Sequence, residues 1–150
     1  MTVEHKFNIG DIVTVNKKDT HLIRMDLYEG KSFTIKKINI NYYSNRISPD
    51  IEYINENNKF VSEQALTLKQ RGNNTDVITT KFEVGNKVKI IKNNSPLHWK
   101  LQKEVGDTFQ IDQINIRYPL DKVGIEYSEG YGISGRWCPE SKLVLVKKKS

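Results

Sequence analysis

The segment FNIGDIVTV, residues 7–15, returns later in the chain as FEVGNKVKI, residues 82–90. Other blocks return in the same order, at offsets that stay between 74 and 77 residues. These blocks are GKSFTI (30–35) against GDTFQI (106–111), INI (38–40) against INI (114–116), IEY (51–53) against IEY (125–127), and FVSE (60–63) against WCPE (137–140). The sequence therefore predicts an internal duplication, with two copies of one fold.

Apolar and polar residues alternate through both copies. Val13 faces one way and Thr14 the other, and residues 87–92 alternate in the same manner with lysine outward. This period of two predicts half-buried antiparallel strands. Residues 62–66 and 139–143 are long enough for only a single 3₁₀ turn before the last strand of each copy. We therefore predict an all-β protein in which each copy has five short strands that form a small, strongly bent barrel.

Glycine stands just before a predicted strand at matched positions of the two copies. The first pair is Gly10 and Gly85, and the second is Gly30 and Gly106. A glycine repeated at such a place predicts a tight turn with a positive φ angle, where a Cβ atom would be costly.

The predicted domains follow the duplication. Residues 1–70 form the first barrel, residues 81–147 form the second, and residues 148–150 form a basic tail. Residues 71–80 are the predicted linker, because this part of the chain begins with a polar stretch that contains glycine and paired asparagines.

The repeated motifs resemble those of tandem SH3-like (KOW-like) small β-barrel proteins of bacterial and bacteriophage type. The resemblance rests on Phe-x-x-Gly-Asp-x-Val-x-Val near the start, Gly-x-x-Phe-x-Ile in the middle and aromatic-x-x-Glu-x-x-Leu-x-Leu at the end, and it covers about residues 6–69 and 81–147. It implies two tandem SH3-like five-stranded barrels. Members of this broad group bind RNA, DNA, ribosomal and transcription machinery, peptides or other proteins, and catalysis is rare among them.

Composition and charge are those of an ordinary globular protein with a mild positive excess. The net charge is +6, with 11 Lys and Arg against 9 Asp and Glu in residues 1–75 and 13 against 9 in residues 76–150. No apolar run approaches the roughly 20 residues that span a bilayer, and residues 1–6 lack a signal-peptide pattern. The single Cys138 is expected to be a buried, inert thiol. We therefore expect a cytoplasmic protein that has no membrane partner.

No constellation of catalytic or metal-binding residues stands out. The three histidines are His5, His21 and His98. None of them has a partner at metal-ligand spacing. The glycines of residues 129–135 lead into a predicted strand and not into a helix, so we expect a glycine-rich hairpin there and no phosphate site. Glu63 and Glu140 are the best acid candidates, and we expect them to accept hydrogen bonds from backbone amides or to pair with lysine. The sequence predicts no catalytic residue, no metal, no cofactor and no enzyme.

Positions at which the two copies differ are better binding candidates than shared positions, because the core requires the shared ones. Three stretches with aromatic and basic side chains qualify. They supply His98, Trp99 and Lys100; Tyr42, Tyr43 and Arg46 with Arg117 opposite; and Tyr131 with Arg136. Such side chains suit base stacking and the centres of protein interfaces. Two alternatives stay open: Trp99 closes the bottom of a barrel, or the tyrosine loop only shields its own strands.

The sequence as a whole predicts a non-enzymatic binding or adaptor protein that engages nucleic acid or nucleic-acid-handling machinery. A pI near 9.3, the stacking residues and the resemblance favour this partner. The alternative, of nearly equal weight, is a protein–protein interaction module, such as a bacteriophage inhibitor or modulator of a bacterial protein complex. Steep dependence of binding on salt separates the first hypothesis from the second. The oligomeric state is not specified by the sequence.

Overall fold

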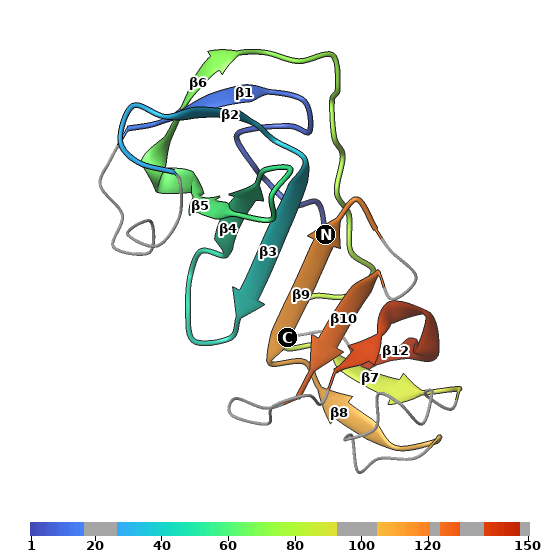
Figure 1. Ribbon diagram of the computed structural model, residues 1–150. Helices are drawn as coiled ribbons and strands as arrows, with labels where there is room; N and C mark the ends of the chain where they lie inside the picture. Colours follow the sequence, from blue (N-terminus) through green and yellow to red (C-terminus); the bar gives the residue numbers. More distant parts are fainter. Residues whose placement is uncertain (17–26, 93–104, 121–123, 130–136, 148–150) are drawn as a thin grey trace. The chain divides into compact units, whose positions relative to one another are not determined.

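Strands account for nearly all of the regular structure (Figure 1). The computed structural model describes residues 1–16, 27–92, 105–120, 124–129 and 137–147. Within these ranges no α-helix occurs, and the only helical elements are two 3₁₀ turns, η2 (Glu63–Ala65) and η4 (Glu140–Lys142). The predicted all-β class and both predicted 3₁₀ turns are therefore confirmed.

The described strands fall into two runs along the chain. The first run is β1 (Ile12–Val15), β2 (Ser32–Thr34), β3 (Lys37–Tyr43), β4 (Asp50–Ile54), β5 (Phe60–Ser62) and β6 (Leu66–Gln70). The second run is β7 (Lys87–Ile90), β8 (Thr108–Gln110), β9 (Gln113–Tyr118), β10 (Ile125–Ser128), β11 (Cys138–Pro139) and β12 (Leu143–Lys147). Each 3₁₀ turn leads directly into the last strand of its run.

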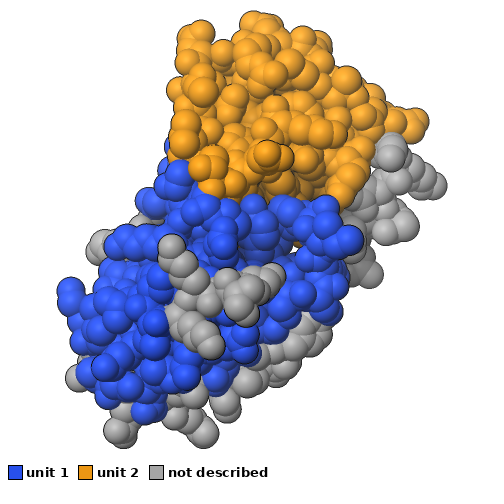
Figure 2. All heavy atoms as spheres, turned by 180° about the vertical axis from the view of Figure 1, so that it is seen from behind, with its two compact units in different colours: residues 1, 41–49, 79–150 blue, residues 2–40, 50–78 orange. Residues whose placement is uncertain are grey.

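The chain folds into two compact units (Figure 2). Unit 2 comprises residues 2–40 and 50–78, and unit 1 comprises residue 1 together with residues 41–49 and 79–150. Unit 2 contains the sheet β2-β1-β6. It also contains residues 37–40 of β3 with β4 and β5, which are neighbours in the order β3-β4-β5. Unit 1 contains the sheet β12-β7-β8 and the strands β11, β10 and β9, which are neighbours in that order. None of the sheets formed by the described strands is closed, so the pair of five-stranded barrels stays a prediction.

The core of each unit is built from the alternating apolar side chains of its strands. In β1 and β7 every second residue is buried, as the period-two pattern predicts. The buried strand residues of unit 2 include Val13, Val15, Phe33, Ile38, Ile40, Tyr53 and Val61, and those of unit 1 include Val88, Ile90, Phe109, Ile114, Ile116, Tyr127 and Cys138. The inward residues are thus the ones that the two halves of the sequence share in type.

The turn before the first strand requires glycine in both units. Gly10 has a φ angle of +92° and Gly85 has a φ angle of +93°, values that side chains with a Cβ atom rarely adopt. The amide of Gly10 donates to the carbonyl oxygen of Ile35 at 2.9 Å, and the amide of Gly85 donates to that of Ile111 at 2.8 Å. The predicted positive φ angle of these turns is confirmed.

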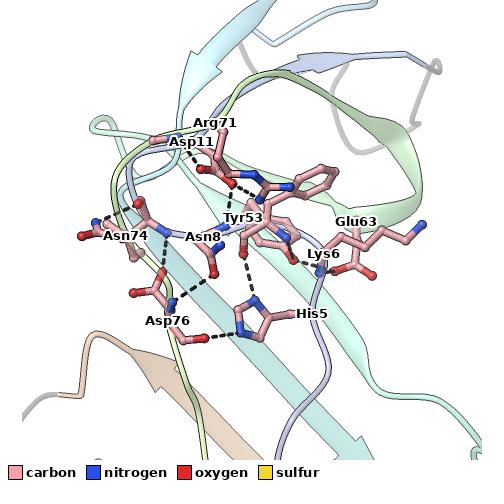
Figure 3. A network of polar contacts seen from close by, with 12 residues as sticks. His5, Lys6, Asn8, Asp11, Tyr53, Glu63, Arg71, Asn74 and Asp76 are labelled. Atoms are coloured by element: carbon pink, nitrogen blue, oxygen red, sulfur yellow. Dashed lines mark hydrogen bonds and ion pairs between the residues drawn. The ribbon is translucent and has the colours of Figure 1, made fainter.

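Unit 2 includes a polar network that fastens residues 71–76, most of the predicted linker, along residues 5–11 (Figure 3). At its centre the buried carboxylate of Asp11 accepts hydrogen bonds from Arg71 Nη1 at 2.8 Å, from the Gly72 amide at 2.7 Å and from the Asn8 amide at 2.9 Å. Gly72 approaches so closely that a Cβ atom there would lie 2.7 Å from the carbonyl carbon and oxygen of Gly10. This contact requires glycine at position 72.

The same network continues to Asp76. Its carboxylate accepts the amide hydrogen of Ile9 at 2.5 Å, and its amide donates to the side-chain oxygen of Asn8 at 3.1 Å. The ring of His5 lies between two carbonyl oxygens, with Nδ1 2.9 Å from that of Phe7 and Nε2 3.0 Å from that of Asp76. Backbone hydrogen bonds of this part of the chain are therefore satisfied by unit 2 itself.

No helix within the described residues is long and apolar enough to span a membrane.

Candidate interaction surface

The three-stranded sheets of the two units have the same register, position by position. In unit 2 Thr14 of β1 lies opposite Ser32 of β2 and Thr67 of β6. In unit 1 Lys89 of β7 lies opposite Thr108 of β8 and Val144 of β12. These positions face away from the core, because their strand neighbours are buried. The two outer faces can therefore be compared residue by residue.

On the outer face of unit 2, polar side chains bind one another. The Thr14 hydroxyl lies 2.9 Å from the Ser32 hydroxyl. One step along the sheet, Asn16 Nδ2 donates to Thr67 Oγ1 at 2.5 Å. Side chains that satisfy one another in this way offer few free hydrogen-bonding groups to a ligand.

The same positions of unit 1 carry lysines and apolar side chains. Lys89 stands where unit 2 has Thr14, and Lys87 stands where it has Ile12. The hydrogen-bonded pair Asn16 and Thr67 corresponds to Ile91 and Val144, which are 41% and 39% exposed. An apolar pair next to exposed lysines is thus built at the place where unit 2 has a closed polar pair.

The edge strands of the two sheets differ as well, with an apolar side chain in unit 1 where unit 2 has a charged one. Both strands carry a bulge, between Leu68 and Gln70 in β6 and between Leu145 and Lys147 in β12. The bulged residue is Lys69 in unit 2, whereas in unit 1 it is Val146, which is 49% exposed. Lysine at an edge strand discourages pairing with another chain, and β12 has valine at this position. We call Lys87, Lys89, Ile91, Val144 and Val146 the lysine–valine face.

Unit 1 also carries the whole net charge of the protein. Its residues include 14 Lys and Arg against 8 Asp and Glu, a net charge of +6. Unit 2 has 10 of each and is neutral. The division into units therefore concentrates the positive charge more strongly than the two halves of the sequence do. An anionic partner is attracted to unit 1 more than to unit 2.

The predicted site residues Tyr42, Tyr43, Arg46 and Arg117 all lie in unit 1. Residues 41–49 contact the rest of unit 1 at Asn115 and Asp112. Asn115 Nδ2 donates to Asn41 Oδ1 at 2.7 Å, the Ser44 amide donates to the carbonyl oxygen of Asp112 at 2.9 Å, and the Ser44 hydroxyl donates to the Asp112 carboxylate. The exposed Arg46 guanidinium is 4.8 Å from the centre of the Tyr43 ring. This is a cation–π pair of the kind that also contacts nucleic-acid bases.

These four residues do not form a single patch. The contacts of Asn41 with Asn115 and of Ser44 with Asp112 run antiparallel, so Arg46 and Arg117 lie at opposite ends of the paired segment. Arg117 Nη2 is 2.8 Å from Glu126 Oε1, which balances its charge within the unit. The other predicted site residues, His98, Trp99, Lys100, Tyr131 and Arg136, lie outside the described residues.

The two acid candidates hold the core of their own units together. Glu63 Oε2 accepts the amide hydrogen of Lys6 at 3.1 Å and the hydroxyl hydrogen of Tyr53 at 2.5 Å. Glu140 Oε2 accepts the amide hydrogen of Lys81 at 3.0 Å and also the hydroxyl hydrogen of Tyr127. The expected hydrogen bonds from backbone amides are therefore present.

These contacts also change the acidity of both tyrosines. Burial raises the pKa of Tyr53 far above its ordinary value, and the hydrogen bond to the Glu63 carboxylate raises this pKa further. Burial and the hydrogen bond to Glu140 raise the pKa of Tyr127 in the same way. A neutral tyrosine that donates to a carboxylate is a structural link.

Candidate metal ligands and the thiol offer no further site in the part of the chain that the structure describes. No group of three or more His, Cys, Asp or Glu side chains there is arranged to hold a metal ion. The thiol of Cys138 is fully buried, as the sequence led us to expect.

Sequence reasoning missed the lysine–valine face. It compared the two copies only at their loops, although the exchange of Thr67 for Val144 and of Lys69 for Val146 is already visible in the matched strands. The missing information was the register, which shows that these positions share one outer face and that Lys69 and Val146 are the bulged residues.

Comparisons of the chain with protein-family models, with curated proteins and with solved structures found no match.

Proposed function

We propose that this protein is a non-enzymatic binding module, and that unit 1 binds another protein through the lysine–valine face. One observation carries the proposal. At matched positions of two sheets with the same register, unit 2 has the hydrogen-bonded pair Asn16 and Thr67, and unit 1 has the exposed pair Ile91 and Val144. Exposed apolar side chains on a sheet surface do not stabilise the sheet as much as they would in a core, so they favour a role in binding.

The charges around this apolar pair favour an acidic partner. Lys87 and Lys89 are exposed on β7, and no residue of β7, β8 or β12 is acidic. A protein surface that combines apolar groups with carboxylates complements this arrangement, since apolar contact supplies affinity and opposite charge supplies orientation and association rate. The scaffold in this proposal is the pair of tandem SH3-like barrels, and the location is the cytoplasm.

The experiment is affinity capture with the tagged protein from a lysate of the organism that encodes it, or of its host, with nuclease present. The test variant is Ile91→Asn combined with Val144→Thr, which copies the residues of unit 2. The control variant is Asn16→Ile combined with Thr67→Val, which makes the opposite exchange in unit 2. We expect capture of a specific protein that the test variant loses at least tenfold and the control variant retains. Equal capture by wild type and test variant would show that the face is not the binding site.

Nucleic-acid binding is the second candidate function, and the charge of unit 1 favours it. The net charge of +6 in this unit and the pair formed by Arg46 and Tyr43 are the supporting observations. If several lysines contact phosphates, affinity for a random-sequence oligonucleotide falls by about 10³-fold or more between about 50 and 200 mM salt. An affinity that is weak and nearly independent of salt would leave protein binding as the function.

A further inference from the structure

One edge of β12 pairs with no other strand that the structure describes. Among the described strands β12 stands at the end of its sheet and pairs only with β7. Such an edge presents a row of backbone N–H and C=O groups that can form a ladder with another chain. Beyond the one buried residue at its start, Leu143, the strand exposes Val144, Leu145 and Val146 in succession.

The matched edge in unit 2 shows what protection would look like. There β6 also ends its sheet, but it has Thr67 and Lys69 where β12 has Val144 and Val146. Thr67 is occupied by its hydrogen bond with Asn16, and Lys69 sits on the bulge. Charged residues at bulges are a common means of preventing strand addition. The bulge of the edge strand thus carries lysine in unit 2 and valine in unit 1, where the one lysine of β12 is Lys147 at its end.

We propose that an extended, acidic segment of a partner protein adds as a strand to the edge of β12. In this mode main-chain hydrogen bonds supply affinity, and alternate side chains of the added strand supply specificity. Val144 and Val146 contact apolar side chains of the added strand, and Lys89 on the outer face of the sheet attracts its carboxylates. The proposal rests on the proposed function, because it specifies how the lysine–valine face holds a protein.

Charge and backbone chemistry favour this occupant over two others. A second copy of the chain would bring its own Lys-rich strands against these strands, and like charges across neighbouring strands destabilise a sheet. A nucleic acid would satisfy the lysines, but it offers no strand backbone to the edge. Valine side chains also lack the aromatic rings on which bases stack. An acidic peptide satisfies the backbone edge, the valines and the lysines together.

The test is a selection from a displayed library of random peptides of about twelve residues against the full-length protein. We expect enrichment of sequences in which apolar and acidic residues alternate. The variant Val144→Thr combined with Val146→Lys copies the edge of unit 2, and both positions are exposed, so it is expected to fold. It should bind the enriched peptides at least tenfold more weakly. Lack of enrichment for the alternating acidic pattern, or equal binding to this variant, would overturn the proposal.

A second measurement distinguishes strand addition from docking on the face alone. An enriched peptide is made twice more, with methyl groups on the odd-numbered or on the even-numbered backbone nitrogens, so that one of the two peptides loses the hydrogen-bond donors that face β12 and keeps its side chains. Strand addition predicts at least a tenfold loss of affinity for one methylated peptide and a smaller loss for the other, measured by calorimetry. Equal affinity of all three peptides would refute strand addition. If methylation does not change the affinity of the peptide, but the variant Ile91→Asn with Val144→Thr still fails to capture the lysate protein, the proposed function stands and only strand addition fails.

Discussion

In unit 2 the ring of Phe7 meets that of Tyr53 edge-on, with centroids 5.2 Å apart and planes at 71°. In unit 1 the ring of Phe82 meets that of Tyr127 at the same 5.2 Å and at 70°. The inner contacts of the two units are thus nearly superimposable in their geometry. Their outer faces share the register but not the chemistry, as the exchange of Thr14 for Lys89 shows.

Each unit is therefore free to vary on the outer face of its sheet and not in its core. A residue that fills the core is fixed by packing, because loss or gain of a methyl group there costs stability. A residue on the outer face of a sheet contributes little to stability, so its identity can serve binding. Unit 2 has a polar surface there whose side chains bind one another, and unit 1 has the lysine–valine face.

A second difference lies just before the first strand, where Asp11 of unit 2 is matched by Asn86 of unit 1. Asp11 is fully buried and binds Arg71 and Gly72, whereas the matched Asn86 accepts a hydrogen bond from the Glu83 amide at 2.8 Å. In unit 2 the contacts of Arg71 and Gly72 thereby depend on the Asp11 carboxylate.

The largest expected effect follows from this second difference. Asp11→Ala leaves the amides of Asn8 and Gly72 without their acceptor and the Arg71 charge without its partner, so the free energy of unfolding should fall by about 3 kcal/mol. Asn86→Ala removes one neutral acceptor and should cost about 1 kcal/mol. Urea unfolding of both variants measures the two values. Equal losses would show that the fastened segment contributes nothing to unit 2.

Gly72→Ala should have the next largest effect. Its Cβ atom would meet the backbone of Gly10 at 2.7 Å and the Asp11 amide nitrogen at 3.1 Å, and backbone atoms cannot yield as a flexible side chain can. We expect a loss of about 2 kcal/mol from this overpacking. The control is Gly106→Ala, which has open space but a φ angle of +97° and should cost about 1 kcal/mol. Thermal unfolding compares them, and a tolerated Gly72→Ala would contradict the close approach.

Alkaline pH should act equally on the two units through Tyr53 and Tyr127. Both have a pKa raised above the ordinary value by burial and by a neighbouring carboxylate. The folded state thus holds the proton more tightly than the unfolded state, and this contribution is fully present below about pH 10 and is lost as the pH rises beyond it. At pH 11 the loss amounts to about 1.4 kcal/mol for each tyrosine.

The control for this prediction removes the titrating groups. Tyr53→Phe and Tyr127→Phe should each be less stable than the wild type at neutral pH by about 1 kcal/mol, since each loses the hydroxyl that donates to a glutamate. Between pH 9 and pH 11 the free energy of unfolding of each variant should fall by only about half as much as that of the wild type. A different pH slope for the two variants would show that the units are less alike than their ring contacts indicate.

The smallest effect on stability should come from the exchange that matters most for binding. Val144→Thr replaces one exposed side chain by the residue of unit 2, and the free energy of unfolding should change by no more than about 0.5 kcal/mol. Chemical denaturation alongside the reverse change, Thr67→Val, tests this. A loss above about 2 kcal/mol for Val144→Thr would mean that the valine is part of the core and not of a binding surface.

Much of the fold could be predicted because it depends on local pattern. Alternation of Val13 with Thr14 and of Val88 with Lys89 gives the inward and outward faces of β1 and β7. Gly10 and Gly85 stand at turns with positive φ, and the short segments at Glu63 and Glu140 form 3₁₀ turns. The Glu63 and Glu140 carboxylates accept backbone amides as expected.

The all-β class, the inner faces and the turns follow from the sequence alone, since each depends on neighbours a few residues apart. The tertiary structure was needed to show which strands pair in which register, and so to place Val144 beside Lys89 and Val146 on a bulge. It alone brought Gly72 onto Gly10 and grouped residues 41–49 with unit 1. Such contacts join residues far apart in the chain, and they are fixed by packing and hydrogen bonding that no local pattern records.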